Sequence, residues 1–422
     1  MDLTGISRTM TLAYSLVERA AAQLAPRAAV RVIESDQQAL DIAHDLATDF
    51  AQGAALRDSQ RRLPHEELDR FSASGLWGIT VPSSRGGAGV SAHTLAQVIA
   101  RISAADGSLG QIPQNHFYAI EVLRVHGTTQ QQDFFYQRIL EGDRLGNALA
   151  ERTTKTASER STRLSVHDEQ SYRLSGRKFY ATGAYYADWI PTAVTDPRGN
   201  QLLAFVSRGA QGVEVIDDWS GFGQRTTASG TVTFDNVVVP REHVMPLQLA
   251  HGPRTTIKPF AQILHAAIDL GIARGAYDEA REFIRKHARA WIDSGVDTAT
   301  QDPMTLNELG RLDVRLEAAD ALVERAARLL DEARQVGAGP EHAELAAVAV
   351  AEARTLTTEV ALSASTKLLE LGGTRSSASE LNLDRYWRNA RVHTLHDPVR
   401  WKVAAVGQFY LHGNLPIISG TT

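Results

Sequence analysis

Two histidines and an aspartate stand close together near the C-terminal end of the sequence, in the stretch RVHTLHDPV. His393 and His396 lie three positions apart, a spacing that puts two side chains on one face of a helical turn, and Asp397 follows directly. An imidazole titrates near neutral pH, so it can both hold and release a proton during a reaction. The H-x-x-H-D spacing also suits a metal, but the sequence shows no other cluster of ligand residues. We therefore expect acid–base chemistry here, with His396 as the principal group, although buried histidines with a purely structural role are the alternative.

Two glycine-rich stretches could cradle a phosphate, but their spacing does not fit. GITVPSSRGGAG at 78–89 has a strand-like start and three glycines before a predicted helix. The six-residue spacing of a dinucleotide-binding loop is missing, and no acidic residue ends a second strand about 20 residues later. GFGQRT at 221–226 has only two of the three glycines and lies between predicted strands. Both stretches are interpreted as turns.

The composition is that of an ordinary globular protein that is poor in sulfur. Its 422 residues include 44 Lys plus Arg and 49 Asp plus Glu, a net charge of −5, which gives no electrostatic basis for binding nucleic acid or anionic membranes. Cys is absent, which excludes disulfides, thiolate metal sites and iron–sulfur clusters, and there are only four Met. Two explanations for the low sulfur content stay open: chance, and selection for a protein that is made when sulfur is scarce. The first residues carry charges instead of a clean apolar segment, and the richest apolar run, 345–351, is too short to cross a bilayer, so we expect a cytoplasmic protein.

The type of predicted element changes twice along the chain. After an extension over 1–34, helical periodicity dominates a first domain over 35–144, and Ser35 and Ser91 are expected to cap two of its helices. Period-two alternation predicts a middle domain over 145–250 with short antiparallel strands within 171–183, 201–209, 212–219 and 230–240. The third domain, 251–422, is predicted as an antiparallel four-helix bundle and a tail, with helices within 263–291, 306–335, 341–373 and 384–397. The βαβ alternation of a Rossmann fold is missing.

Five stretches, in this order, resemble the acyl-CoA dehydrogenase superfamily. They are VPSSRGGAG at 81–89, GRKFYATGA at 176–184, DDWSGFGQRTTASGTVTFDNVVVP at 217–240, LGGTRSS at 371–377 and DRYWRNAR at 384–391. The resemblance covers about residues 35–410. It implies an α+β fold with an N-terminal helical domain, a middle antiparallel β-barrel-like domain and a C-terminal four-helix bundle.

The sequence departs from the dehydrogenase pattern where that family does its chemistry. Asp397, followed by Pro398, falls where the dehydrogenases carry the Glu that removes the α-proton of an acyl thioester, and Asp is one methylene shorter. The Asn of the flavin-strand motif is Gly183, and the flavin segment is altered to GNALAERTTKTASER at 146–160. GNALAE, DDW, T-x-SG and HTLHDPV look like the flavin-dependent monooxygenase branch of the superfamily, which contains dibenzothiophene monooxygenase-like and sulfur-acquisition enzymes.

Membership of that branch implies the oxygenase component of a two-component system. A separate NAD(P)H:flavin reductase supplies reduced FMN, O₂ adds to the flavin to give a C4a-peroxyflavin, and one oxygen atom passes to a small organic substrate. The low sulfur content favours an organosulfur substrate, with an amine or an aromatic carbon as the alternative acceptor. The resemblance also implies a homotetramer.

The resemblance assigns roles to individual residues around the flavin. Thr182 is expected to hydrogen-bond the isoalloxazine edge, Asn147 to lie near N5 with a share in catalysis, and Trp219 and Ser229 to border flavin or substrate. Thr182 also suits a plain strand position, Asn147 a turn cap and Trp219 an interface.

Further roles concern the phosphate and the proton. Arg289 matches a bundle arginine that contacts cofactor phosphate across a subunit interface, Arg375 is a second candidate, and both also suit a solvated surface. His393 and His116 are expected to share the proton work of His396, with a structural role for His116 equally open. Tyr118 and Asp397 are expected to face the substrate.

Two alternatives stay open at this point. The first is an FAD-dependent acyl-CoA dehydrogenase that uses Asp397 as its base. The second is a scaffold of the same fold without catalytic activity.

Overall fold

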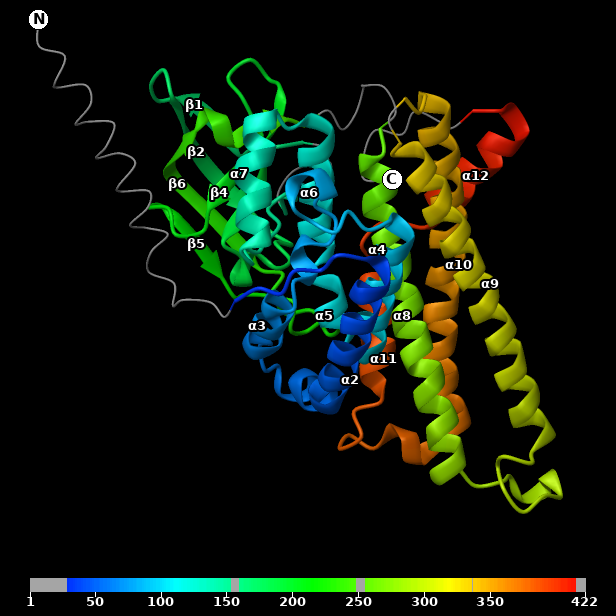
Figure 1. The fold of residues 1–422 in the computed structure, drawn as a ribbon. Coiled ribbons are helices and arrows are strands. Elements are labelled where there is room, and N and C mark those ends of the chain that lie inside the picture. Colours follow the sequence, from blue (N-terminus) through cyan, green and yellow to red (C-terminus); the bar gives the residue numbers. More distant parts are fainter. Residues whose placement is uncertain (1–28, 153–158, 248–254, 336, 415–422) are drawn as a thin grey trace, which may run out of the picture.

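The computed structural model describes residues 29–152, 159–247, 255–335 and 337–414, in which a helical layer is followed by a sheet and then by a bundle (Figure 1). The helical layer contains α2 (Asp36–Gln60), α3 (His65–Ala73), α4 (Ala92–Ala105), α5 (Gly107–Gln111), α6 (Gln114–His126) and α7 (Thr129–Leu140). The side chains of Ser35 and Ser91 accept hydrogen bonds from Gln38 N and Thr94 N, so both predicted N-caps are confirmed. Residues 79–81 form a turn beside the glycines, so the interpretation of this stretch as a turn is confirmed.

The middle part is a seven-stranded sheet in the order β5-β6-β2-β1-β3-β4-β7. Its strands are β1 (Arg163–Val166), β2 (Ser171–Lys178), β3 (Trp189–Thr195), β4 (Gln201–Ser207), β5 (Val213–Ile216), β6 (Thr231–Pro240) and β7 (Val244–Pro246). Neighbouring strands are antiparallel except β1 and β3, which pair in parallel where Arg163 lies opposite Thr195. The sequence pattern did not indicate β3, because WIPTAVT is buried along nearly its whole length and contains Pro191, so it shows no alternation.

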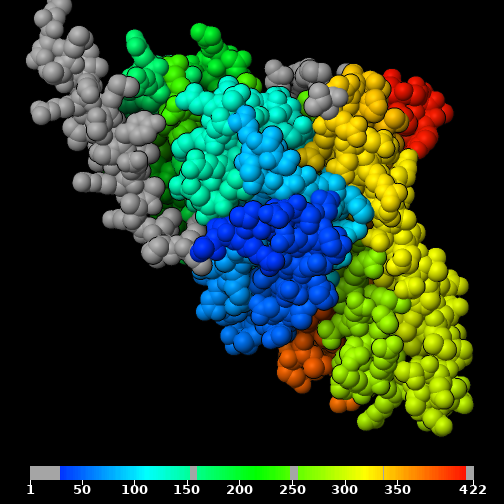
Figure 2. All heavy atoms as spheres, viewed as in Figure 1, coloured from blue at the N-terminus to red at the C-terminus, as the bar shows by residue number. Residues whose placement is uncertain are grey.

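The bundle contains α8 (Ile257–Lys286), α9 (Pro303–Ala333) and α10 (Pro340–Gly372), followed by the shorter α11 (Asp384–His393) and α12 (Arg400–His412). The predicted helix over 263–291 ends at Lys286, because residues 287–291 are partly or fully exposed and offer no apolar stripe to bury. The connection between α8 and α9 projects at the end of the bundle that lies farthest from the sheet (Figures 1 and 2).

Helix α8 forms the centre of the molecule and packs against α4, α6, α9 and α10. A Cβ added at Gly271 would lie 2.3 Å from the carbonyl oxygen of Ala100, so the absence of a side chain lets α8 approach the backbone of α4. Most of α8 is apolar and buried, but Gln262, His265 and Asp269 are buried polar residues on the same helix. Buried polar groups in such a helix need partners, and these define the site described below.

The sheet docks onto the helices through aromatic side chains and a loop. Phe135 of α7 lies with its ring centroid 4.5 Å from that of Phe205 and 5.3 Å from that of Trp189. The loop before β6 reaches α11, where Gln224 N donates to Asn389 Oδ1 at 2.7 Å. The sheet is therefore fixed relative to α11, the helix that ends at His393. Within the described ranges, no helix has both the length and the apolar character required to span a membrane.

Candidate active site

The linker 145–150 carries Asn147 to the edge of the sheet. Gly146 N donates to Trp189 O at 2.9 Å and Ala148 N to Pro191 O at 3.0 Å, so the linker runs alongside β3. Asn147 lies between these two contacts and is 9% exposed. Its Nδ2 donates to Tyr180 O at 3.2 Å and its Oδ1 accepts from Leu149 N at 3.0 Å. Asn147 thus joins the linker to the residues just after β2, and its amide keeps a second N–H for another acceptor.

Three hydroxyls form a directed chain beside this position. Thr182 Oγ1 lies 2.7 Å from Ser229 Oγ, which lies 2.7 Å from Thr227 Oγ1. Thr227 Oγ1 donates to the carbonyl oxygen of Gln224 at 2.9 Å, and a carbonyl can only accept. Thr227 must therefore accept from Ser229, and Ser229 must accept from Thr182. The chain uses the proton of Thr182 and leaves its oxygen as an acceptor.

The end of this chain faces the start of α6. Gly183 has φ +77°, and a Cβ added there would lie 3.4 Å from the carbonyl oxygen of Ile112, two residues before α6. Gln114, at the start of α6, donates from Nε2 to Ala261 O of α8 at 3.3 Å. Ala261 precedes His265 by one helical turn, so Gln114 joins the start of α6 to the part of α8 that carries His265. On the next turn of α6, Tyr118 is 7% exposed, and burial raises the pKa of its phenol to about 12 despite the nearby Arg160.

Three imidazoles meet where α8, α11 and the turn after α11 come together. His393 is the last residue of α11, and the turn returns so that His396 N donates to His393 O at 3.0 Å. The His265 ring lies between the other two, with its centroid 5.1 Å from that of His393 and 4.1 Å from that of His396. The i, i+3 spacing therefore does place His393 and His396 on one side, although His396 lies beyond the helix. His265 was not anticipated from the sequence.

His393 and His265 belong to a hydrogen-bonded chain that starts at Asp269. His393 Nδ1 lies 2.5 Å from Asp269 Oδ1, and His265 Nδ1 lies 3.0 Å from His393 Nε2. Burial opposes ionisation of Asp269, but Arg354 and His393 outweigh it and lower the pKa of this carboxyl group. The carboxylate accepts, so His393 carries its proton on Nδ1 and accepts at Nε2 from the N–H of His265 Nδ1. Burial lowers the pKa of both rings, which keeps them neutral.

Asp397 is buried in an ion-pair cluster, so the sequence-based expectation that it faces the substrate is wrong. Lys402 Nζ lies 2.6 Å from its Oδ2, Arg354 Nη2 lies 3.6 Å from its Oδ1, and the side chain is fully buried. Burial opposes ionisation, but the hydrogen bond from His396 and the two cations hold the pKa of Asp397 well below its usual range. A carboxylate fixed in this way is a poor proton acceptor.

His396 is the imidazole of this cluster that reaches accessible space. Its side chain is 38% exposed, whereas those of His393 and Asp397 are fully buried. Its Nδ1 lies 3.3 Å from Asp397 Oδ1, which leaves Nε2 as the outward nitrogen. In the part of the chain that the structure describes, no three His, Cys, Asp or Glu residues are arranged to hold a metal ion.

His116 has a structural role in place of the proton role expected for it. Leu145 N donates to its Nδ1 at 3.0 Å, and its Nε2 donates to Trp77 O at 2.9 Å. The ring is fully buried, and burial lowers its pKa to about 3. Both nitrogens are used and the ring stays neutral, so His116 fixes the start of the linker that carries Asn147.

Trp219 and the loop after it border the hydroxyl chain. The Trp219 indole donates from Nε1 to Gln224 O at 2.9 Å, and its ring centroid lies 6.3 Å from that of Tyr180. Gln224 is 1% exposed, and neither atom of its carboxamide has a hydrogen-bond partner among the described residues. An unpartnered buried amide, a hydroxyl that can only accept and a spare amide N–H are groups that a polar aromatic ring could satisfy. The residues on this side of the site therefore fit a flavin.

Arg289 and Arg375 lie far from this cluster. Both are exposed, Arg289 just after α8 and Arg375 in the short turn after α10. The helix rises by about 1.5 Å per residue, so the end of α8 at Lys286 lies roughly 30 Å from His265. Neither arginine can reach the histidine cluster of its own chain.

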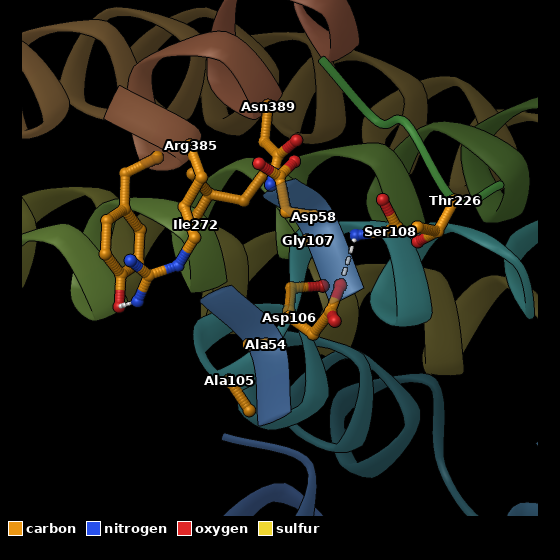
Figure 3. Close-up of a pocket in the computed structure, with 12 residues that line it drawn as sticks. Ala54, Asp58, Ala105, Asp106, Gly107, Ser108, Thr226, Ile272, Arg385 and Asn389 are labelled. Carbon is orange, nitrogen blue, oxygen red and sulfur yellow. Dashed lines mark hydrogen bonds between the residues drawn. The ribbon is translucent and has the colours of Figure 1, made fainter. Parts of the chain in front are cut away.

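A small polar pocket lies where α2, α5, α8, α11 and the loop before β6 meet (Figure 3). Its charged groups are already paired. Asp106 accepts from Arg57 Nε at 3.0 Å, and Asp58 accepts from Arg388 Nη2 at 2.6 Å. Asn389, which lines the pocket, holds the loop through Gln224. The pocket is part of the joint that positions α11.

Comparison with known families identifies the class of protein. Residues 34–143 match the family described as "Acyl-CoA dehydrogenase, N-terminal domain", and residues 263–401 match "Acyl-CoA dehydrogenase, C-terminal domain". The chain belongs to the acyl-CoA dehydrogenase family.

Individual relatives narrow this class. A dibenzothiophene monooxygenase of Rhodococcus erythropolis is 33% identical over 398 residues, 91% of this chain and 95% of that protein. A probable FMNH2-dependent monooxygenase, SfnC of Pseudomonas putida, is 33% identical over 392 residues, 90% of this chain and 96% of that protein. The crystal structure of FMN-bound TdsC from Paenibacillus sp. A11-2 has a TM-score of 0.87 and 31% identity, covering 91% of this chain and all of that one. Within its family, the chain is thus similar to flavin-dependent monooxygenases.

Proposed function

We infer that this protein is the oxygenase component of a two-component, FMN-dependent monooxygenase that oxidises a small organic molecule in sulfur metabolism. The observation that carries this conclusion is the state of Asp397. A dehydrogenase of this fold needs a carboxylate free to take a proton, but Asp397 is held by Lys402 and Arg354 and shielded by His396. An accessible imidazole has replaced an accessible carboxylate. The similarity to FMN-dependent relatives supports the same conclusion.

Reduced FMN, when bound, supplies the electrons that activate O₂. We propose that Thr182 and Asn147 hold the edge of its ring, with Ser229 behind Thr182 and Trp219 at the border of the site. Because the hydroxyl chain leaves Thr182 as an acceptor, it suits the N5–H of a reduced flavin better than the lone pair of an oxidised one. Tyr118 and the α6 helix form the opposite wall and help to exclude water.

We propose that His396 handles the proton of the reaction at its Nε2. Asp397 fixes the other ring nitrogen and His265 supports the ring face, so the Nε2 atom points away from the cluster. Reduction of one oxygen atom to water needs a proton when the flavin arrives as an anion. An accessible imidazole can deliver that proton and regain it from solvent.

The substrate and partners are proposed from the relatives and the composition. Dibenzothiophene is the substrate in the name of one relative, and the scarcity of Met and Cys suits a protein made when sulfur is limiting, so we propose an organosulfur substrate. Reduced FMN must come from a separate NAD(P)H:flavin reductase, which we propose to work beside this protein in the cytoplasm.

We propose a homotetramer in which Arg289, assisted by Arg375, binds the FMN phosphate of a neighbouring subunit. Both side chains are exposed and far from their own histidine cluster. A guanidinium matches phosphate with two parallel hydrogen bonds.

The test uses purified protein, reduced FMN and ¹⁸O₂, with dibenzothiophene and small organosulfur compounds as substrates. We expect one ¹⁸O atom in the product by mass spectrometry. The His396→Ala variant should bind reduced FMN with an unchanged Kd but form product roughly 100-fold more slowly or worse. Unchanged turnover in this variant removes His396 from the mechanism. Desaturation of an acyl-CoA without ¹⁸O transfer would establish a dehydrogenase, and failure to bind flavin in either redox state would establish an inactive scaffold.

A further inference from the structure

A buried cluster of charges and imidazoles underlies His396, and much of it is unused by the function proposed above. Asp269 and Asp397 carry two negative charges, and Arg354 contacts both of them while Lys402 contacts Asp397. Asp269, Asp397 and Arg354 are 0–2% exposed, and Lys402 is 4% exposed. Burying four charges costs free energy that apolar side chains would not cost. A cluster of this kind beside a reactive group points to a functional role.

His265 connects the two halves of the cluster. On one side, its Nδ1 is bound to the Asp269–His393 pair, and on the other its ring lies against His396 with centroids 4.1 Å apart and planes inclined by 37°. The hydrogen bonds run in one direction, from His265 to His393 to Asp269. They fix the orientation of the His265 ring and draw its N–H proton toward the carboxylate, which makes the ring more electron-rich.

We propose that His265 is a positioning residue for His396, oriented by Asp269 through His393, and that it presents an electron-rich ring face which holds His396 in place and favours its protonated form. The proposal rests on the proposed function, because it deepens the role of His396. It adds two residues of α8 that the sequence did not single out. His265 acts through His396 and touches no reacting atom.

The charges around His396 set the direction of the expected effect. His396 interacts with His265 of α8, with His393 at the end of α11 and with Asp397 of its own turn. Asp269 of α8, Arg354 of α10 and Lys402 of α12 act on these three neighbours, and Lys258 of α8 adds its charge near Lys402. The two carboxylates balance Arg354 and Lys402. Replacing Asp269 by Asn removes one negative charge, so a proton on His396 becomes less favourable.

The test measures titration of His396 without flavin or substrate. Diethylpyrocarbonate modifies neutral imidazoles, and peptide mass spectrometry gives the rate at His396 as a function of pH. Asp269→Asn should lower the pH midpoint of His396 modification by about one unit. His265→Phe keeps a ring against His396 but breaks the chain, so its midpoint should fall in the same direction. Asp278→Asn, which makes the same change at an exposed position of α8, should leave the midpoint unchanged.

An unchanged or raised midpoint in Asp269→Asn and His265→Phe would overturn the proposal. If Asp269→Asn does not fold, as judged by thermal melting, His265→Phe decides alone by the same criterion. In the product assay, the loss of activity with rising pH should begin at lower pH in both variants. The modification assay is independent of turnover, so failure of the monooxygenase assignment would leave its result standing.

Discussion

Single side chains set hydrogen-bond polarity in this site, and the three hydroxyls beside the sheet show how. Gln224 O can only accept, so Thr227, Ser229 and Thr182 must all donate in the same direction. The oxygen of Thr182 is therefore an acceptor because of a carbonyl three hydrogen bonds away. The immediate neighbours of Thr182 alone do not determine whether its hydroxyl donates or accepts.

Thr227→Val should weaken the distinction between redox states of the flavin. Without the Thr227 hydroxyl, Ser229 and Thr182 can reverse their donors, so Thr182 can also serve an oxidised ring. The ratio of the Kd for oxidised FMN to the Kd for reduced FMN should fall roughly fivefold to tenfold, the value of about one hydrogen bond. Anaerobic titration followed by absorbance measures both constants. Thr233→Val, which makes the same change at a half-exposed position of β6, should not change the ratio, and an equal change in both variants would refute the directed chain.

The sequence singles out His396 as a candidate by its chemistry, but it does not show what surrounds this residue. The H-x-x-H-D stretch indicates imidazoles with a titratable neighbour, and in the structure the rings of His393 and His396 both lie against that of His265. The burial of Asp397 as an ion-paired carboxylate depends on Lys402 and Arg354, and Arg354 lies more than forty residues away in sequence on another helix. His265 and Asp269 do leave a detectable signal, since two polar residues four positions apart interrupt the otherwise apolar stretch 263–273 of α8.

At the scale of elements, His116 joins three segments of backbone. It lies on α6, donates to the carbonyl of Trp77 and accepts from the N–H of Leu145, where the linker to the sheet begins. Its ring is neutral because burial lowers its pKa to about 3, whereas an unfolded chain protonates histidine near pH 6.5. The folded state therefore loses stability relative to the unfolded state as pH falls from about 6.5 toward 3.

His116→Leu should reveal this dependence. At pH 8 the variant should be less stable by about 2 kcal/mol, because it leaves a buried carbonyl and a buried N–H without partners. Lowering the pH to 5.5 costs the wild type about 1.4 kcal/mol through His116 and costs the variant nothing there, so the difference should shrink. Urea unfolding at both pH values measures it. His44→Leu, at an exposed site on α2, should show no such convergence, and a difference independent of pH would contradict a neutral His116.

The order of elements followed from periodicity, and the errors have physical causes. Helices α9 and α10 begin and end within a few residues of their predicted bounds, and α2 and α4 begin at the predicted caps, because capping residues and apolar stripes mark them. Strand β3 was missed because it is buried along its length, and α12 because much of its apolar surface is exposed in a single chain. The local pattern of apolar residues does not reveal a strand that is buried on both faces or a helix whose apolar side chains are exposed.

At the scale of the whole molecule, the length of α8 separates two parts of one proposed site. The helix spans about 45 Å, with His265 near one end and the exposed Arg289 beyond the other. If Arg289 binds the phosphate of FMN, the arginine and the imidazole of one site must come from different subunits. A single chain would then hold two half-sites.

Mixing two inactive variants tests this arrangement. Arg289→Ala should weaken binding of reduced FMN, and His396→Ala should abolish product formation. Co-expressed, they should recover about a quarter of wild-type activity, because random assembly pairs an intact arginine with an intact histidine at that share of sites. The double variant mixed with Arg289→Ala supplies no intact pair and should stay inactive. Full FMN affinity in Arg289→Ala would exclude the arginine from the site.

The one-turn spacing of His265 and Asp269 along α8 limits how a chain of this kind can change over generations. Replacing Asp269 alone removes one of the carboxylates that neutralise the buried Arg354. Replacing His265 alone leaves the buried Nε2 atom of His393 without its hydrogen-bond donor. An engineer who grafts His265 and Asp269 into a relative must therefore transplant them together with their partners His393 and Arg354.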